Sequence, residues 1–110
     1  MSENELPSPH YKIVCTGRVS DELRKLMERA VAVHRSGQVM AALLELQRLL
    51  SLYPQVGEPL KNLTIEGWTL WHHAFPPLVV KYVIDDNRRE VLINAPILTF
   101  KNAGLDPTNE

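Results

Sequence analysis

Apolar residues recur three and four positions apart in two segments of the first half of the chain, a spacing that predicts two amphipathic helices. Ser20 is the expected N-cap of the first helix, which ends at Ser36-Gly37. The second helix is expected to start near Gln38 and to stop at Pro54. The short break between them predicts a roughly antiparallel helical hairpin. The first stripe consists of Leu23, Leu26, Met27, Ala30 and Val31. The second consists of Val39, Ala42, Leu43, Leu46, Leu50 and Tyr53.

Short apolar and β-branched runs predict strands on both sides of this hairpin. One strand is expected at residues 11–16. Three more are expected at residues 64–75, 78–84 and 89–97, joined by tight turns. The pattern therefore predicts an α+β fold: an N-terminal strand and a two-helix hairpin packed on an antiparallel sheet, with a C-terminal three-strand meander.

The length of 110 residues fits a single domain. We expect it at residues 11–100, between a flexible N-terminal lead, residues 1–10, and a flexible tail, residues 101–110, because both ends are polar and contain proline. Three leucines of the second helix lie outside its stripe, at Leu44, Leu49 and Leu52. Burial is the favoured interpretation of these leucines, and a second face offered to a partner is the alternative.

Charge and cysteine usage narrow the classes of function. The net charge is −1 and the pI about 6.4, whereas proteins that bind nucleic-acid phosphates usually carry a basic surplus. One cysteine, Cys15, excludes an internal disulfide and is expected as a small buried residue of the first strand. The sequence shows neither a signal peptide nor an apolar run of about 20 residues. These features predict a cytoplasmic protein that does not enter a membrane.

Two histidines and two tryptophans in the strand expected at residues 64–75 are the first candidates for chemistry. Neighbours in a strand point to opposite faces, so His72 and His73 cannot ligate one metal together, and no metal or cofactor is expected. A histidine exposed on the sheet is a candidate acid–base group because its pKa lies near neutrality. Trp68 and Trp71 are three positions apart, so they also point to opposite faces of the expected strand. The outward tryptophan is expected to be covered by another element, to stack on a base or to anchor a partner protein.

The second half of the chain also contributes basic candidates. They are Lys61, Lys81, Arg88 and Arg89. Because Arg88 and Arg89 follow Asp85 and Asp86 in a turn, local charge pairing is expected, and a phosphate-binding role is the alternative. The chain contains no phosphate loop, zinc spacing or dinucleotide fingerprint.

Two segments, in order, resemble a known family. They read LLSLYPQVGEPLKNL at residues 49–63 and LVVKYVID at residues 78–85. Together with the preceding strand and helices, and with a tryptophan strand between them, these segments resemble the RelE/ParE toxin superfamily, of the type II toxin–antitoxin, plasmid-stabilisation type. Its members often show a dP..G.pL..L segment after the helices and a later YRvvY.id strand. The resemblance covers about residues 11–97.

The resemblance implies two helices packed on one face of an antiparallel sheet, and it implies two family activities. RelE-like members cut mRNA in the ribosomal A site, so an active member would be a ribosome-dependent mRNA endoribonuclease. ParE-like members inhibit gyrase. Both are usually neutralised by an antitoxin that wraps the toxin. The implied partners are therefore an antitoxin protein and either the ribosome with its mRNA or gyrase, and a homodimer stays open.

Several cations of the family are replaced in this chain. The arginine that the family often places early in the third strand falls at Leu78 or Val79. The basic residues that RelE-like members use on the second strand fall near residues 68–71, where no Lys or Arg stands. After the last strand, only Phe100 and Lys101 correspond to the family's basic and aromatic residues. Cleavage of RNA by its 2′-oxygen needs a base, cations beside the phosphate and an acid, so these replacements argue against full activity.

The departures predict a divergent member: a toxin component or a degenerate relative, with weak or absent ribonuclease activity, that acts by binding a protein target and an antitoxin. A non-enzymatic protein-interaction module that retains the fold is the alternative, and an active ribonuclease is the third hypothesis. The candidate catalytic residues are His72, His73, Lys61 and Lys81. The candidate binding residues are Trp68, Trp71, Arg88 and Arg89.

Overall fold

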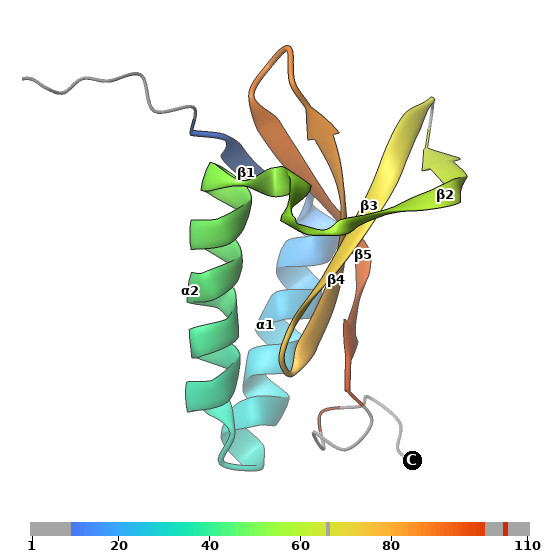
Figure 1. Ribbon diagram of the computed structural model, residues 1–110. Coiled ribbons are helices and arrows are strands. Elements are labelled where there is room, and N and C mark those ends of the chain that lie inside the picture. The colour runs from blue at the N-terminus through green and yellow to red at the C-terminus, as the bar shows by residue number, and fades with distance from the viewer. Residues whose placement is uncertain (1–9, 66, 101–104, 106–110) are drawn as a thin grey trace, which may run out of the picture.

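The computed structural model describes residues 10–65, 67–100 and 105, and at residues 61–65 it describes the backbone alone. These residues form an α+β fold in which two helices pack against a five-stranded mixed sheet (Figure 1). The helices are α1 (Gly17–Ala32) and α2 (Ser36–Leu52), followed by one 3₁₀ turn, η1 (Pro54–Val56). The strands are β1 (Lys12–Cys15), β2 (Glu58–Ile65), β3 (Trp68–Phe75), β4 (Leu78–Asp85) and β5 (Glu90–Thr99).

The strands lie in the order β1-β5-β4-β3-β2. Strands β2 to β5 form an antiparallel meander, and β1 pairs in parallel with β5. The prediction of a wholly antiparallel sheet is therefore wrong at β1. A parallel neighbour requires a long crossover, which here consists of both helices and the three strands that precede β5.

The meander contains one strand more than predicted. The segment at residues 64–75 is divided by a turn at Gly67, whose φ of +85° lies in a region that glycine adopts at little cost. Its first residues belong to β2, which begins at Glu58. Proline, lysine and asparagine early in β2 are depleted in strands generally, which is why the pattern did not indicate it.

The main core lies between the helices and one face of the sheet. Figure 1 shows α1 and α2 side by side on the same side of the sheet. Apolar stripes of both helices meet alternate residues of β3, β4 and β5, as burial of amphipathic elements requires. The buried helical residues are Val19, Leu26, Ala30, Val39, Ala42, Leu46 and Leu50. The buried strand residues of this cluster are Phe75, Leu78, Val80, Tyr82, Ile84, Val91 and Ile93.

Both helices begin earlier than the sequence indicated. The N-cap of α1 is Thr16 rather than Ser20, and its Oγ1 accepts a hydrogen bond from the Val19 N–H at 3.3 Å. The reversal before α2 is made by His34, whose φ is +61°, so Ser36 already belongs to α2. No helix among the described residues is long and apolar enough to cross a membrane.

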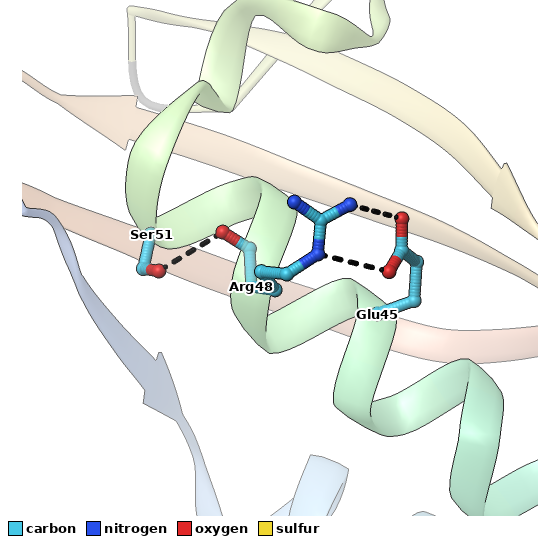
Figure 2. A network of polar contacts seen from close by, with 3 residues as sticks. All are labelled: Glu45, Arg48 and Ser51. Atoms are coloured by element: carbon cyan, nitrogen blue, oxygen red, sulfur yellow. Dashed lines mark hydrogen bonds and ion pairs between the residues drawn. The ribbon is translucent and has the colours of Figure 1, made fainter.

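The outward face of α2 carries both polar and apolar side chains. Arg48 donates two hydrogen bonds to the Glu45 carboxylate, at 3.1 and 2.7 Å, and the Ser51 hydroxyl donates to the Arg48 carbonyl (Figure 2). Leu44 is 60% exposed, so burial was the wrong expectation for this leucine. Leu49 and Leu52 are half-buried.

Two further residues, Cys15 and Leu105, have a burial that the sequence did not indicate. Cys15, the last residue of β1, is exposed at the sheet edge, so the prediction of a buried cysteine is wrong. Partial burial of the sulfur nevertheless raises the thiol pKa, which disfavours a reactive thiolate. The segment at residues 101–110 is described at Leu105 alone, whose side chain is fully buried in the core. The Leu105 carbonyl accepts a hydrogen bond from Arg29 Nε at 2.9 Å.

Candidate functional site

The face of the sheet turned away from the helices, here called the open face, is arranged in three rows that run across the strands. The strand registers define each row, because residues paired across antiparallel or parallel strands share a face. The first row is Lys12, Glu90 and Asp85. The second row is Val14, Leu92, Val83 and Leu70. The third row is Asn94, Lys81, His72 and Glu58.

The third row is polar from β5 to β2. His72 Nε2 lies 3.7 Å from Glu58 Oε1, an ion pair when the imidazole is protonated. Lys81 is half-buried between His72 and Asn94 and forms no ion pair with any described carboxylate. Asn94 Nδ2 is buried and has no hydrogen-bond partner among the described residues. A buried donor without an acceptor is costly, so this row is suited to meet a ligand.

A hollow of about 260 Å³ lies on the open face beside this row. Its floor is apolar, formed by Val83 and Leu92, and one wall is Trp68, whose side chain is 40% exposed. The other lining residues are polar: Asp85, Arg88, Glu90 and Asn94. An apolar concavity bordered by a few polar groups and an exposed tryptophan is a typical ligand or partner site.

The candidate catalytic histidines point to different sides of β3, although both line one hollow of about 490 Å³ together with Glu58. His72 lies in the third row of the open face, whereas His73 lies on the helix-facing side and packs edge-on against Phe75, with ring centroids 4.8 Å apart. Lys81 shares the open face with His72, and the two residues are register partners. The side chain of Lys61 lies outside the described residues. Of this set, the structure therefore places His72 and Lys81 together on the open face, and His72 and His73 around one hollow.

The tryptophans lie on opposite faces, as their parity indicated. Trp68 lines the hollow of the open face. Trp71 is half-buried on the helix-facing side and stacks on Tyr82, with ring centroids 6.5 Å apart and planes inclined by 20°. Trp71 therefore serves the core, and Trp68 is the tryptophan available to a partner.

The basic residues of the β4–β5 turn are not paired with its carboxylates as expected. Asp85 Oδ1 accepts hydrogen bonds from the backbone N–H groups of Asn87 and Arg88, both at 3.1 Å. Asp86 accepts from the Tyr11 hydroxyl at 2.6 Å, which raises the pKa of Tyr11. The Arg89 guanidinium lies 5.7 Å from the centre of the Tyr11 ring.

The prediction of local charge pairing is therefore wrong, because backbone and tyrosine donors occupy the turn carboxylates. The two arginines also take different positions. Arg88 borders the hollow, whereas Arg89 contacts the start of the first strand.

A buried tyrosine joins the turn after α2 to the centre of the sheet. The Tyr82 hydroxyl donates to the Pro54 carbonyl at 2.7 Å and accepts from the Gly57 N–H at 3.2 Å. A Cβ on Gly57 would collide with this hydroxyl and with the His72 carbonyl, so only glycine fits. Burial raises the pKa of Tyr82 to about 12, which keeps the phenol neutral.

Sequence reasoning missed Asp85 and Glu90 as lining residues, and it missed Asn94 and Tyr82. The available signal was the alternation of β5, where Glu90, Leu92 and Asn94 lie between buried residues. In β4, Asp85 likewise follows a buried residue, but Val83 is itself buried, so the alternation is weaker there. Which side of each strand the helices cover is a tertiary fact. The described residues also contain no group of three or more His, Cys, Asp or Glu side chains arranged to hold a metal ion.

Comparison with known proteins leaves the site to be interpreted from its own geometry. No family model, curated protein or solved structure is significantly similar to this chain. Within the described part of the chain, the open face offers a hollow with an apolar floor, the Asn94 amide donor without an acceptor, and Lys81 without an ion pair. These features are better suited to binding than to a multi-residue catalytic centre.

Proposed function

We propose that this chain is a divergent RelE/ParE-like toxin component, or a relative that has lost catalysis, and that it acts by binding protein partners through its open face. The observation that carries the proposal is the junction at Tyr82. The two segments that resemble the superfamily, residues 49–63 and 78–85, meet there through the Pro54 carbonyl and the Gly57 N–H. The proline, glycine and tyrosine of the two motifs thus form one structural unit, which supports reading them as a connected signature.

The placement of the candidate catalytic residues supports weak or absent ribonuclease activity. Transfer of a 2′-hydroxyl proton, stabilisation of the phosphate and protonation of the leaving group require several groups on one surface. His72 and Lys81 share the open face, whereas His73 points to the other side of β3 and packs against Phe75. Both histidines line a second hollow with Glu58, but its described lining contains no lysine or arginine to stabilise a phosphate. In the proposed function, the open face therefore binds a target or an antitoxin and does not cut RNA efficiently.

A non-enzymatic interaction module is the second candidate. Met40 and Leu44, one helical turn apart on α2, favour it, since they are 49% and 60% exposed and neighbouring exposed apolar residues mark protein–protein contacts. In that case the chain binds a partner without arresting growth. The two candidates differ in the consequence of expressing the chain alone.

Induced expression of the full chain in a bacterial host tests the proposal. We expect growth arrest with intact total mRNA, because the protein would act by binding. Trp68→Ala and Lys81→Ala should relieve the arrest, whereas Lys25→Ala, which changes an exposed lysine of α1, should not. Immunoblotting should verify that all variants accumulate equally.

The other outcomes are equally informative. Arrest with cleaved transcripts would restore the ribonuclease hypothesis and direct attention to His72. Normal growth at full expression would contradict a toxin and favour the interaction module. Unchanged arrest in the Trp68→Ala and Lys81→Ala variants would place the toxic surface elsewhere.

A further inference from the structure

Two carboxylates of the hollow stand opposite each other and form no ion pair with the described basic residues. Asp85 and Glu90 are register partners in the antiparallel pair β4–β5 and are both half-buried. Like charges directly opposite each other destabilise a sheet. Lys12 is the neighbour of Glu90 on β1 and Arg88 also lines the hollow, yet neither forms an ion pair with these carboxylates in the described part of the chain. The first row of the open face, Lys12, Glu90 and Asp85, therefore carries one more negative than positive charge.

The surroundings of this carboxylate pair suit one class of group. The indole of Trp68 is the aromatic ring that attracts cations most strongly, and it lines the same hollow. The adjacent floor, formed by Val83 and Leu92, is apolar. Lysine and arginine side chains combine a cationic head with an apolar stem, and they bury the stem along apolar surfaces.

We propose that the hollow binds a lysine or arginine side chain of a partner protein. The stem lies on Val83 and Leu92, and the cationic head lies between the carboxylates of Asp85 and Glu90, against Trp68. The inference rests on the proposed use of the open face for binding, and it names the chemistry of the partner. It goes beyond the toxin hypothesis, which specifies no complementary charge.

Asn94 extends the match beyond the side chain. It lies four residues from Glu90 along β5, about 13 Å at the usual rise of a strand, and lines the far end of the hollow. Its Nδ2 is the buried donor that has no described acceptor. A main-chain carbonyl of the bound segment would satisfy this donor. A phosphate-bearing ligand is disfavoured because Asp85 and Glu90 would repel it.

Binding of a short basic peptide provides a direct test. The chain has two tryptophans, so Trp71→Phe leaves Trp68 as the only indole fluorophore. We expect saturable changes in Trp68 emission with N-acetyl-Gly-Arg-Gly-amide, and weaker binding at high salt because exposed ion pairs are screened. The matched Gly-Glu-Gly peptide should give no change. Should Trp71→Phe not fold, the indole N–H signals of the ¹⁵N-labelled unmodified chain provide the same readout.

The double variant Asp85→Asn and Glu90→Gln should lower the affinity for the arginine peptide at least tenfold. Asparagine at position 85 retains an oxygen that can accept from the Asn87 and Arg88 N–H groups, so the turn is preserved. Glu28→Gln is the matched control, since Glu28 is an exposed carboxylate of α1, away from the open face. It should leave the affinity unchanged.

Three results would overturn the inference. The glutamate peptide could bind as tightly as the arginine peptide, guanosine monophosphate could bind more tightly than the arginine peptide, or the double variant could bind the arginine peptide with unchanged affinity. Failure of the inference is distinguishable from failure of the proposed function. Growth arrest that depends on Trp68 and Lys81, without binding of the basic peptide, would refute only the basic partner. Peptide binding without growth arrest would refute only the toxin.

Discussion

At the scale of single residues, the Tyr82 hydroxyl illustrates how one polar group can join distant segments. Its two hydrogen bonds satisfy a carbonyl and an N–H of the turn after α2, within an otherwise apolar strand. Removing one partner of a buried hydrogen bond typically costs about 1–3 kcal/mol because the other partner stays desolvated. The tyrosine therefore stabilises the connection on which β2 and the third row of the open face depend.

The raised pKa of Tyr82 predicts a loss of stability at alkaline pH. The phenol titrates at about 12 in the folded chain, against an ordinary value of 10.0. Below pH 10, both the folded and the unfolded chain keep the phenol proton of Tyr82, so the contribution of Tyr82 to stability is complete. Between pH 10 and 12 only the unfolded state releases it, so the free energy of unfolding falls by about 1.4 kcal/mol per pH unit.

Urea unfolding of the wild type and Tyr82→Phe from pH 9 to pH 11 checks this prediction. The stability advantage of the wild type should shrink as the pH rises above 10, because phenylalanine has no proton to lose. Tyr53→Phe, at an exposed position, should keep the pH profile of the wild type. Parallel pH profiles for wild type and Tyr82→Phe would contradict the assignment.

The close approach at Gly57 gives a second prediction at this scale. Gly57→Ala should destabilise the fold by about 1–3 kcal/mol, because the new methyl group collides with the Tyr82 hydroxyl and with backbone at His72. Gly37→Ala is the matched control: a Cβ at this position of α2 meets no atom within 4 Å. That control should stabilise the protein by about 0.5–1 kcal/mol through helix propensity. Equal effects of the two substitutions in thermal unfolding would argue against the close approach.

At the scale of elements, the β4–β5 pair is irregular where it meets α1. The register shifts between Val79 and Lys81, so residues 95–97 stand opposite Val80 alone. Such bulges leave backbone groups without ladder partners. The Ile97 N–H donates instead to Glu22 Oε1 of α1 at 2.9 Å. A helix side chain thereby completes the hydrogen bonding of a strand.

This contact predicts a specific role for Glu22. Glu22→Ala should lower the free energy of unfolding by about 1–3 kcal/mol because it leaves the Ile97 N–H without its acceptor, and hydrogen exchange at Ile97 should accelerate. Glu28→Ala removes an exposed carboxylate of the same helix that pairs with Arg24, and it should cost less than about 0.5 kcal/mol. Unchanged exchange at Ile97 in the Glu22 variant would refute the role.

At the scale of the whole molecule, the core is closed by a residue close to the C-terminus. Leu105 is fully buried together with side chains of both helices and the sheet, and Arg29 of α1 holds its carbonyl. The chain thus returns to α1 after the last strand. Leu105 therefore contributes to the core that supports the open face.

Leu105→Ala should therefore destabilise the protein by about 2–5 kcal/mol, the range for a buried leucine replaced by alanine. Leu98→Ala, at a leucine of β5 that is 40% exposed, should cost much less. Chemical denaturation of both variants checks the expectation. A cost for Leu105→Ala no larger than that for Leu98→Ala would mean that residue 105 does not seal the core.

The alternation of side chains along a strand determined which residues of β3 lie on opposite faces. His72 and His73 lie on opposite faces of β3, and so do Trp68 and Trp71. In each pair the two residues are an odd number of positions apart, and side chains alternate between the two faces of a strand. Helical periodicity likewise determined the stripe of α2 that is buried at Val39, Ala42, Leu46 and Leu50. These features are local and repeat with a fixed period, so the sequence alone was enough.

The tertiary structure decided everything that depends on which distant segments meet. It placed β1 parallel to β5, joined Tyr82 to Pro54 and Gly57, and set Asp85 opposite Glu90 beside Trp68. Period and propensity carry no information on strand order or on which sheet face the helices cover, since both follow from the packing of whole elements. The sequence therefore determined the helices, most strands and the two faces of each strand, and the packing decided which face carries the site.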